Sequence, residues 1–241
     1  MKMPDKLKQK YIKQKPNTWR YVIADIHGCA KTVKKLVEEV VVPSKSDQLF
    51  LLGDYIDRGP ASGEVIDYIL YLIEQGYAVY PLHGNHEENM LDDIKEYGKE
   101  SLEMMVRKIT KCPDLLDECG SLKERYVNFM QSLPYYYEMD DCFLVHAGFD
   151  FKKPEPFQDY SAMIQFYIDN ESYDTSVLNE KRMIHGHRIT EIDYIEKLVN
   201  EKSQIISLDN GCAYRKKHKI YDYTKLGNLC CLELNSACTK S

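Results

Sequence analysis

The feature that most constrains the fold is a repeated unit of a short apolar run, a polar segment and an amphipathic helix. Tyr21–Ala24 precedes DIHG, Gln48–Leu52 precedes GDYIDRGP, and Tyr77–Leu82 precedes HGNHEE. Apolar residues then recur at helical spacing, at positions 33, 36, 37 and 40 and at positions 66, 69, 70 and 73. Such alternation indicates a buried, largely parallel or mixed sheet. We also expect Ser62 to cap the second helix and Gly76 to end it.

The later part of the chain predicts a helical segment and then shorter strands. Residues 87–133 are charged and carry another helical apolar stripe. We interpret them as an insertion, which is either a cap over an active site or an ordinary packed addition. Five more strands are expected: Tyr135–Glu138, Cys142–His146, Arg182–His185, Gln204–Leu208 and Leu229–Leu234. We predict one domain over residues 19–241, preceded by a basic tail over residues 1–18.

Composition places the chain among ordinary globular proteins, with 44% apolar and 29% charged residues. Its net charge of −6 argues against a broad nucleic-acid-binding face. No apolar run approaches the ~20 residues of a membrane span, and the Lys-rich start lacks the apolar core of a secretory signal. We therefore expect a cytoplasmic enzyme whose cysteines are free buried thiols rather than disulfides. The tail is interpreted as solvated, with contact to RNA or acidic lipid as the alternative.

Polar side chains that can bind metal ions follow five of the expected strands. They are Asp25, His27, Asp54, Asn85, His86, His146, His185 and His187. Open α/β sheets bind ligands at the carboxyl ends of their strands, so we expect these residues to converge. Carboxylate, imidazole and amide ligands suit divalent ions such as Mn²⁺, Fe²⁺ or Zn²⁺, and one carboxylate can bridge two ions ~3.5–4 Å apart.

Five segments resemble, in order and spacing, the signature blocks of the phosphoprotein phosphatase (PPP) family of metallophosphoesterases, and in particular its bacterial serine/threonine phosphatases. They are DIHG (25–28), GDYIDRG (53–59), GNHE (84–87), HAG (146–148) and GH (186–187). The resemblance extends over residues 19–149 and 182–235. It implies an α/β fold of the calcineurin-like metallophosphoesterase type, a sandwich of two mixed β-sheets flanked by helices, here with a helical insertion.

The resemblance also implies the metal ligands. Asp25, His27 and Asp54 would hold a first divalent ion, with Asp54 bridging to a second. Asn85, His146 and His187 would complete the second site. The cofactors would be two divalent metal ions, Mn²⁺ in the first place and Fe or Zn otherwise.

Catalytic roles follow from the same resemblance. His86, oriented by Asp57, would protonate the leaving oxygen, while Arg58 and Asn85 would bind the phosphate. Metal-bridging hydroxide would attack in line, with no phosphoenzyme. The alternative for Asp57 and Arg58 is a simple surface ion pair.

The sequence departs from the family pattern at three places. Ala24 replaces a common Gly, and residues 152–180 lack the arginine that usually binds phosphate there. Arg188 follows the GH pair, where relatives often have Thr. We interpret Arg188 as the substitute phosphate ligand, the alternative being that it faces solvent or pairs with Glu191. His185 matches no family ligand and is expected to face the sheet interior or a backbone carbonyl.

The expected activity is hydrolysis of a phosphomonoester. The substrate would be a phosphorylated protein, through phosphoserine or phosphothreonine, or a small phosphoester. The alternative is a dinucleoside polyphosphate such as diadenosine tetraphosphate. An inactive metal-binding scaffold is a third reading, against which the complete ligand set argues.

Overall fold

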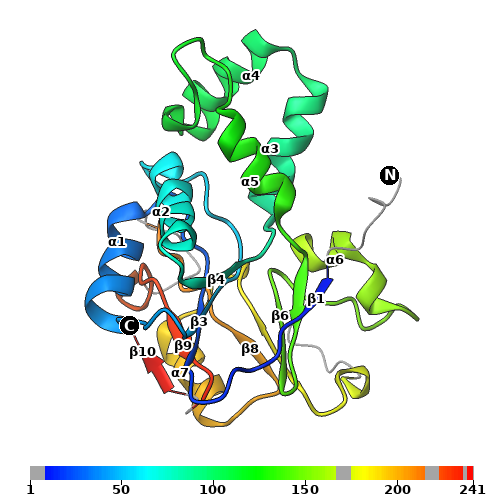
Figure 1. The fold of residues 1–241 in the computed structure, drawn as a ribbon. Helices are drawn as coiled ribbons and strands as arrows, with labels where there is room; N and C mark the ends of the chain where they lie inside the picture. The colour runs from blue at the N-terminus through cyan, green and yellow to red at the C-terminus, as the bar shows by residue number, and fades with distance from the viewer. Residues whose placement is uncertain (1–8, 167–174, 215–222, 236–237, 241) are drawn as a thin grey trace.

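The strands of the computed structural model form two five-stranded sheets, and the structure describes residues 9–166, 175–214, 223–235 and 238–240 (Figure 1). The first sheet has the order β10-β9-β2-β3-β4. Its strands are β2 (Arg20–Ile23), β3 (Gln48–Leu51), β4 (Ala78–Pro81), β9 (Cys231–Glu233) and β10 (Cys238–Lys240). β2, β3 and β4 are parallel, whereas β9 is antiparallel to both β2 and β10.

The second sheet has the order β1-β5-β6-β7-β8. Its strands are β1 (Gln9–Tyr11), β5 (Tyr136–Glu138), β6 (Cys142–Val145), β7 (Arg182–His185) and β8 (Ile205–Ser207). Only the β5–β6 pair is antiparallel. Both sheets are therefore mixed, and the predicted α/β class and two mixed sheets are confirmed. The eight predicted strands are all present, most of them shorter at one or both ends than predicted.

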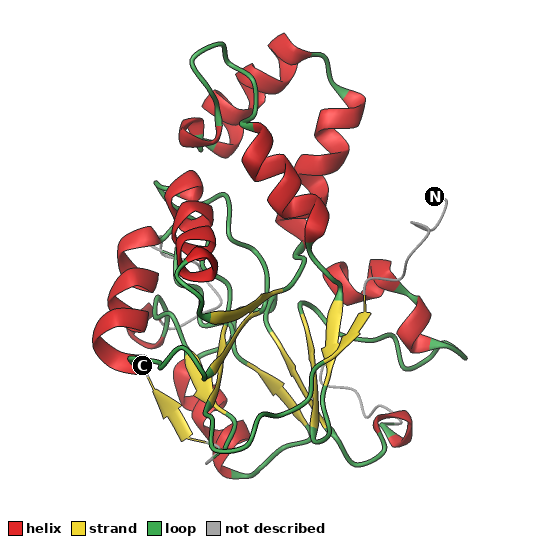
Figure 2. Ribbon diagram, viewed as in Figure 1, coloured by secondary structure: helices red, strands yellow, loops and turns green. Residues whose placement is uncertain are grey.

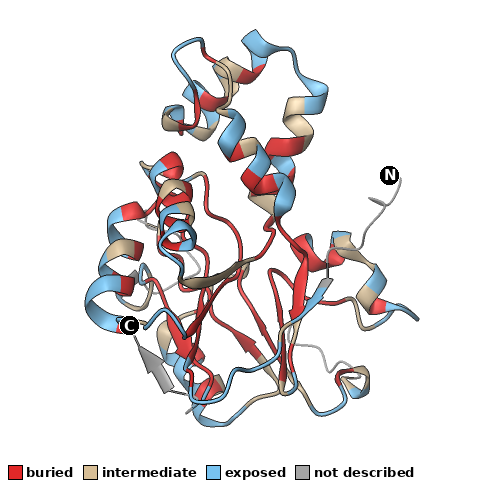
Figure 3. Ribbon diagram, in the orientation of Figure 1, coloured by how far each residue is buried: buried red, intermediate tan, exposed pale blue. Residues whose placement is uncertain are grey.

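The two sheets pack face to face because successive side chains of a strand point to opposite faces. In β2, Val22 joins a core that contains Phe50 from the same sheet and Leu144 and Ile184 from the other. Its neighbour Ile23 faces the opposite way and joins the helices that cover the first sheet. Figure 3 shows the resulting concentration of buried residues in the strands. The sandwich thus has its central core between the sheets and helices outside.

Two helices cover the outer face of the first sheet. They are α1 (Ala30–Lys35), which continues into a π-helical turn η1 (Leu36–Val41), and α2 (Ser62–Glu74). The prediction that Ser62 caps α2 is wrong, because Ser62 is already helical and its hydroxyl accepts the Asp57 N–H instead, at 3.0 Å. The prediction for Gly76 is confirmed: it follows the last turn at a φ of 84°, where glycine carries no Cβ strain.

Residues 85–132 form the predicted helical insertion, which stands apart from the sheets and contains no strand among its helices (Figures 1 and 2). Its elements are α3 (Asn85–Glu96), α4 (Lys99–Met105), η2 (Val106–Thr110), η3 (Pro113–Leu115) and α5 (Glu124–Ser132). The chain leaves and rejoins the sandwich at neighbouring points, where the His83 N–H donates to the Pro134 carbonyl at 2.9 Å.

The remaining helices lie after β6. They are η4 (Pro156–Gln158), α6 (Tyr160–Gln165), η5 (Ser176–Leu178), α7 (Ile192–Asn200) and η6 (Tyr223–Lys225). Part of residues 152–180, for which no element was predicted, is therefore helical, and residues 167–174 lie outside the described part. Among the described residues, no helix is long and apolar enough to cross a membrane.

Two expectations about the chain ends and cysteines can be compared with this fold. Residues 9–11, which lie within the expected tail, form β1 and pair with β5 at an edge of the second sheet. Residues 1–8 lie outside the described part. The seven cysteines whose side chains are described are all free, and all except Cys119 are buried, as predicted.

Candidate metal centre and active site

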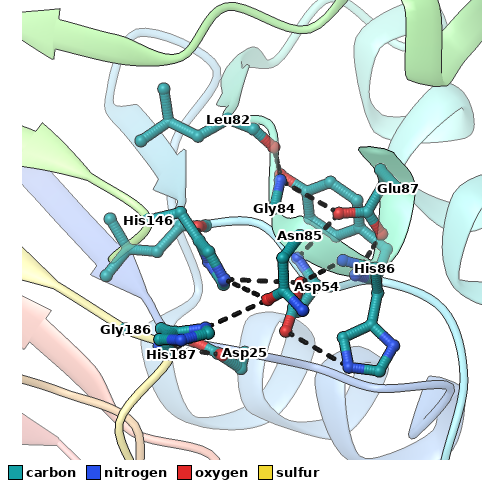
Figure 4. Close-up of polar contacts among 12 residues, drawn as sticks. Asp25, Asp54, Leu82, Gly84, Asn85, His86, Glu87, His146, Gly186 and His187 are labelled. Carbon is teal, nitrogen blue, oxygen red and sulfur yellow. Dashed lines mark hydrogen bonds and ion pairs between the residues drawn. The ribbon is translucent and has the colours of Figure 1, made fainter. Parts of the chain in front are cut away.

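The polar residues that follow the strands meet at one end of the sandwich, as predicted. Asp25 and His27 come from the loop after β2, Asp54 from the loop after β3, and Asn85 begins α3 after β4. His146 and His187 follow β6 and β7. Figure 4 shows Asn85, His146 and His187 gathered beside Asp54. Among the described residues, two groups have ligand atoms within 4.8 Å of one another: His27 with Asp54 and His86, and Asp54 with His146 and His187.

The second group includes Asn85 as well. Its Oδ1 lies 3.0 Å from His146 Nε2 and 3.0 Å from His187 Nδ1. The other ring nitrogen of His146 is 2.8 Å from the Leu52 carbonyl, so it carries the proton there and Nε2 presents a lone pair. An amide oxygen and a nitrogen lone pair therefore face each other in a partly buried space. A cation between them would satisfy both atoms.

In the first group, too, a backbone carbonyl orients the histidine ring. His27 Nδ1 lies 3.0 Å from the Ile56 carbonyl, which directs the Nε2 lone pair into the site, 3.4 Å from Asp54 Oδ2. Within the described structure this buried Nε2 has no hydrogen-bond partner. The other oxygen, Asp54 Oδ1, lies 3.4 Å from His146 Nε2. Asp54 thus presents one oxygen to each group, as a bridging ligand would.

Asp25 lies beside this pair of groups rather than inside either. Its two carboxylate oxygens accept the backbone N–H of His187 at 3.1 and 3.0 Å. Burial and the charges of Asp209 and Asp54 raise the pKa of Asp25 well above its usual value. A nearby cation would favour the ionised carboxylate, and the place of Asp25 in the first metal site stays a prediction.

The protonation states fit metal binding. Burial lowers the pKa of His27 to about 4 and that of His146 to about 3, so both rings are neutral near pH 7. Burial alone would raise the pKa of Asp54, but the imidazoles around it hold that pKa well below its usual range. Neutral imidazoles, a carboxylate and an amide oxygen are available without the loss of a proton. The donor set fits two divalent ions, with Asp54 shared.

His86 and Asp57 form the predicted pair. His86 Nδ1 lies 2.7 Å from Asp57 Oδ2, and the two side chains are only 18% and 13% exposed. Burial disfavours the imidazolium, but the hydrogen bond to Asp57 and the charges of Asp54 and Asp57 outweigh it and raise the pKa of His86. The Asp57 carboxylate thus pairs with His86 and not with Arg58, the partner in the surface-ion-pair alternative. Arg58 is exposed, and its Nη2 lies 3.3 Å from His86 Nε2.

Backbone conformation at the site is unusual. His27, Asp54, Asp57, Arg58 and His187 all have positive φ angles, between 46° and 66°. Residues with a Cβ are strained in this left-handed region, by about 1–3 kcal/mol each. The surrounding packing must hold them there, so the site is shaped before any ligand binds.

Two glycines allow the loops to approach closely. A Cβ on Gly84 would lie 2.3 Å from Asp54 Oδ1, and one on Gly186 would lie 2.0 Å from Asp25 Oδ1. Both contacts are shorter than any real Cβ makes, so these positions accept only glycine without movement of a candidate ligand. These two glycines therefore have a structural role that serves the site.

Glu87 is a site residue for which no role was predicted. Its buried carboxylate accepts the N–H of Asp54 at 2.9 Å, of Tyr55 at 2.8 Å and of Gly84 at 3.1 Å. It therefore fixes the backbone of the proposed bridging ligand. A signal was available, because a glutamate three residues after a helix N-cap position commonly accepts the N-cap N–H.

Three further residues surround the site. Asp209, also missed, is buried; one of its oxygens accepts the Gly211 N–H at 2.7 Å, and the other has no partner within the described structure. His185 is buried with Nδ1 3.0 Å from the Gly186 carbonyl, which fits the expectation of a backbone carbonyl partner. The partly exposed Arg188 follows His187 directly. Its role as a phosphate ligand stays a prediction.

Comparison with known proteins assigns the family. The family profile described as "Calcineurin-like phosphoesterase" matches residues 20–210, which is most of the chain. The chain therefore belongs to the calcineurin-like phosphoesterases, which are metal-dependent phosphoric ester hydrolases, and the predicted family is confirmed.

Curated relatives are similar over part of their length. A protein of Pseudomonas fluorescens (strain Pf0-1) named "Bis(5'-nucleosyl)-tetraphosphatase, symmetrical" is 30% identical over 53% of this chain and 41% of its own. A protein of the same name from Buchnera aphidicola is 29% identical over 64% of this chain and 53% of its own. The chain thus spans about half, or less, of the length of these relatives.

Solved structures share the fold. A crystal structure of a protein provisionally assigned as a diadenosine tetraphosphatase has a TM-score of 0.64 at 19% identity, and the match covers 95% of this chain and 96% of that one. A protein serine/threonine phosphatase from Saccharomyces cerevisiae gives a TM-score of 0.58 at 16% identity, covering 93% and 75%. At these identities the likeness supports the sandwich architecture alone.

Proposed function

We propose that this chain hydrolyses dinucleoside polyphosphates, with a bis(5'-nucleosyl) tetraphosphate as substrate, at a centre of two divalent ions. The observation that carries the chemistry is Asp54, whose two oxygens each lie 3.4 Å from the imidazole of a separate ligand group. The names of the curated relatives support the nucleotide substrate. They do not support a phosphorylated protein as the substrate, which was the expectation from the sequence.

His27 and Asp54, with Asp25 beside them, would hold one ion, and Asp54, Asn85, His146 and His187 would hold the other. Bound ions would polarise the phosphate and lower the pKa of water, which makes a nucleophile available near neutral pH. Mn²⁺ is our first choice, and Fe and Zn suit the same ligands.

Arg58 and His86 would act on the substrate together. When the His86 ring is cationic, its Nε2–H and the Arg58 guanidinium are both donors, and they lie 3.3 Å apart. Two donors that close repel each other unless an anionic oxygen accepts from both. A phosphate oxygen in that position would be bound by Arg58 and would lie within reach of the proton of His86. Asn85 would contribute its amide N–H group from the opposite side.

The reaction balances with water as the only co-substrate. Symmetrical hydrolysis breaks the central P–O bond of the tetraphosphate, so that water adds OH to one half and a proton to the other. His86 would donate that proton to the leaving oxygen, and the products are two nucleoside diphosphates. A leaving phosphate with a pKa of about 6 needs less protonation than the alkoxide released from phosphoserine. The acid should therefore matter less for the nucleotide substrate than for a protein substrate.

The experiment that tests the proposal is a side-by-side assay of the Mn²⁺-loaded protein on diadenosine tetraphosphate, a phosphoserine peptide and an aryl phosphate. Chromatography of the nucleotide products should give ADP alone, since asymmetric cleavage would give ATP and AMP. We expect kcat/KM on diadenosine tetraphosphate to exceed that on the peptide. A faster reaction on the peptide, with no ADP formed, would instead support the protein phosphatase.

A further inference from the structure

The carboxylate of Asp57 is held from two sides. Its Oδ2 contacts His86 Nδ1 at 2.7 Å, and its Oδ1 lies 3.3 Å from the Sγ of Cys112, whose thiol donates to it. Thr110 Oγ1 lies 2.9 Å from the same sulfur. Cys112 is fully buried and belongs to the helical insertion, 55 residues from Asp57 along the chain. Thr110, Cys112, Asp57 and His86 therefore form one continuous chain of hydrogen bonds.

We propose that Cys112 is a positioning residue for proton transfer: its thiol fixes the Asp57 carboxylate, and through it the His86 ring, in the orientation that serves the leaving group. The proposal rests on the general-acid role of His86 in the proposed function. Cys112 lies in none of the five motif blocks, so only the folded structure brings it to the site.

The thiol is suited to donate. Burial raises the pKa of Cys112 to about 12, so the thiol keeps its proton and remains a donor near neutral pH. A thiolate in the same place would repel the Asp57 carboxylate. The Thr110 hydroxyl has two acceptors within reach, the sulfur at 2.9 Å and the Val106 carbonyl at 3.4 Å. With either acceptor, the S–H proton of Cys112 is free to point toward Asp57.

The position of Cys112 is itself fixed by contacts next to Asp57. Two residues later, Asp114 Oδ2 accepts the N–H of Gly63 at 2.5 Å and that of Glu64 at 3.4 Å, at the start of α2. The Ser62 hydroxyl, in the same turn, accepts the Asp57 N–H at 3.0 Å. The insertion is thus fastened to the loop that carries Asp57. A shift of the insertion would move Cys112 and Asp57 relative to each other and disturb His86.

A purely structural role predicts a different outcome. If Cys112 only fills the core, its removal lowers stability and reduces activity on every substrate by the same factor. If it positions the acid, the loss depends on how much the leaving group needs a proton. Phenyl phosphate has a poor leaving group and p-nitrophenyl phosphate a good one, so the ratio of their kcat values separates the two roles.

The variants are Cys112→Ala, Cys112→Val and Cys112→Ser, with Cys142→Ala as the matched control. Ala and Val both remove the donor, and Val preserves volume; Ser keeps a donor. We expect Ala and Val to lower kcat on phenyl phosphate by about threefold to tenfold, the worth of one hydrogen bond, with less than about a twofold change on p-nitrophenyl phosphate. Ser should restore the ratio. Cys142 is equally buried but begins β6, away from the site, and its variant should keep the wild-type ratio.

A second readout does not depend on turnover. In ¹⁵N-labelled protein, the Nδ1–H proton of His86 should give a protected, downfield signal that Cys112→Ser retains and Cys112→Val weakens. If Val and Ser both keep the wild-type kcat ratio and signal, the proposal is overturned, even if Ala does not fold. His86→Asn is the reference: equal losses on both aryl phosphates would remove the acid role and the proposal with it. If His86→Asn lowers kcat selectively on phenyl phosphate but Cys112→Val does not, only the proposed role of Cys112 is excluded.

Discussion

Glu87→Gln is the substitution whose cost follows most directly from the structure. Oε2 of Glu87 accepts two backbone N–H groups, at 2.9 and 3.1 Å, and Oε1 accepts the N–H of Tyr55 at 2.8 Å and that of Ile56 at 3.4 Å. A glutamine can keep its oxygen toward the pair, but its NH₂ then faces the Tyr55 N–H in a fully buried space. A hydrogen bond from Tyr55 is lost and two donors face each other, which should cost about 2–4 kcal/mol of unfolding free energy. For a chain of this size the Tm should fall by roughly 5–12 °C.

Calorimetry and metal analysis would measure the two consequences. Because Glu87 fixes the backbone of Asp54, bound metal should fall along with stability. Glu103→Gln is the matched control, since Glu103 makes a partly exposed i,i+4 pair with Arg107 at 2.8 Å. That change should cost less than about 0.5 kcal/mol. A Glu87→Gln protein with a Tm within about 2 °C of wild type and full metal content would refute the reasoning.

Three further predictions concern the site. Asp54→Asn removes the charge shared by the two ligand groups, so metal content and turnover should fall together; elemental analysis that finds two metals and a near-native rate would contradict this. His86→Asn should keep metal but slow esters with poor leaving groups by roughly 10²–10⁴-fold, with activated aryl phosphates much less affected. Arg188→Ala should lower kcat/KM by roughly 10- to 150-fold if Arg188 binds phosphate, with metal content unchanged. A value within about twofold of wild type would leave Arg58 as the main phosphate ligand.

Periodicity predicted alternating strands and helices, and the resemblance to the PPP family supplied the two-sheet sandwich. Apolar runs predicted eight strands of the two sheets but not β1 or β10. The residues after those runs included Asp54, His146 and the other candidate ligands. Strand ends were less accurate: Cys142–His146 was predicted, whereas β6 stops at Val145. The apolar pattern does not indicate the residue at which a strand ends and the loop that directs a ligand into the site begins.

The sequence by itself determined which residue types stand at the ends of the strands, because side-chain direction in a strand and polarity after it are local properties. Only the tertiary structure decided how those residues are held. The carbonyl of Leu52 that orients His146 is 94 residues away, and the thiol of Cys112 reaches Asp57 across 55 residues. Such contacts depend on the packing of separate elements, so the residue types alone do not predict them. The sequence also does not predict the left-handed backbone of His27, Asp54 and Arg58. Surrounding contacts, and not the preferences of these residues, hold them in that conformation.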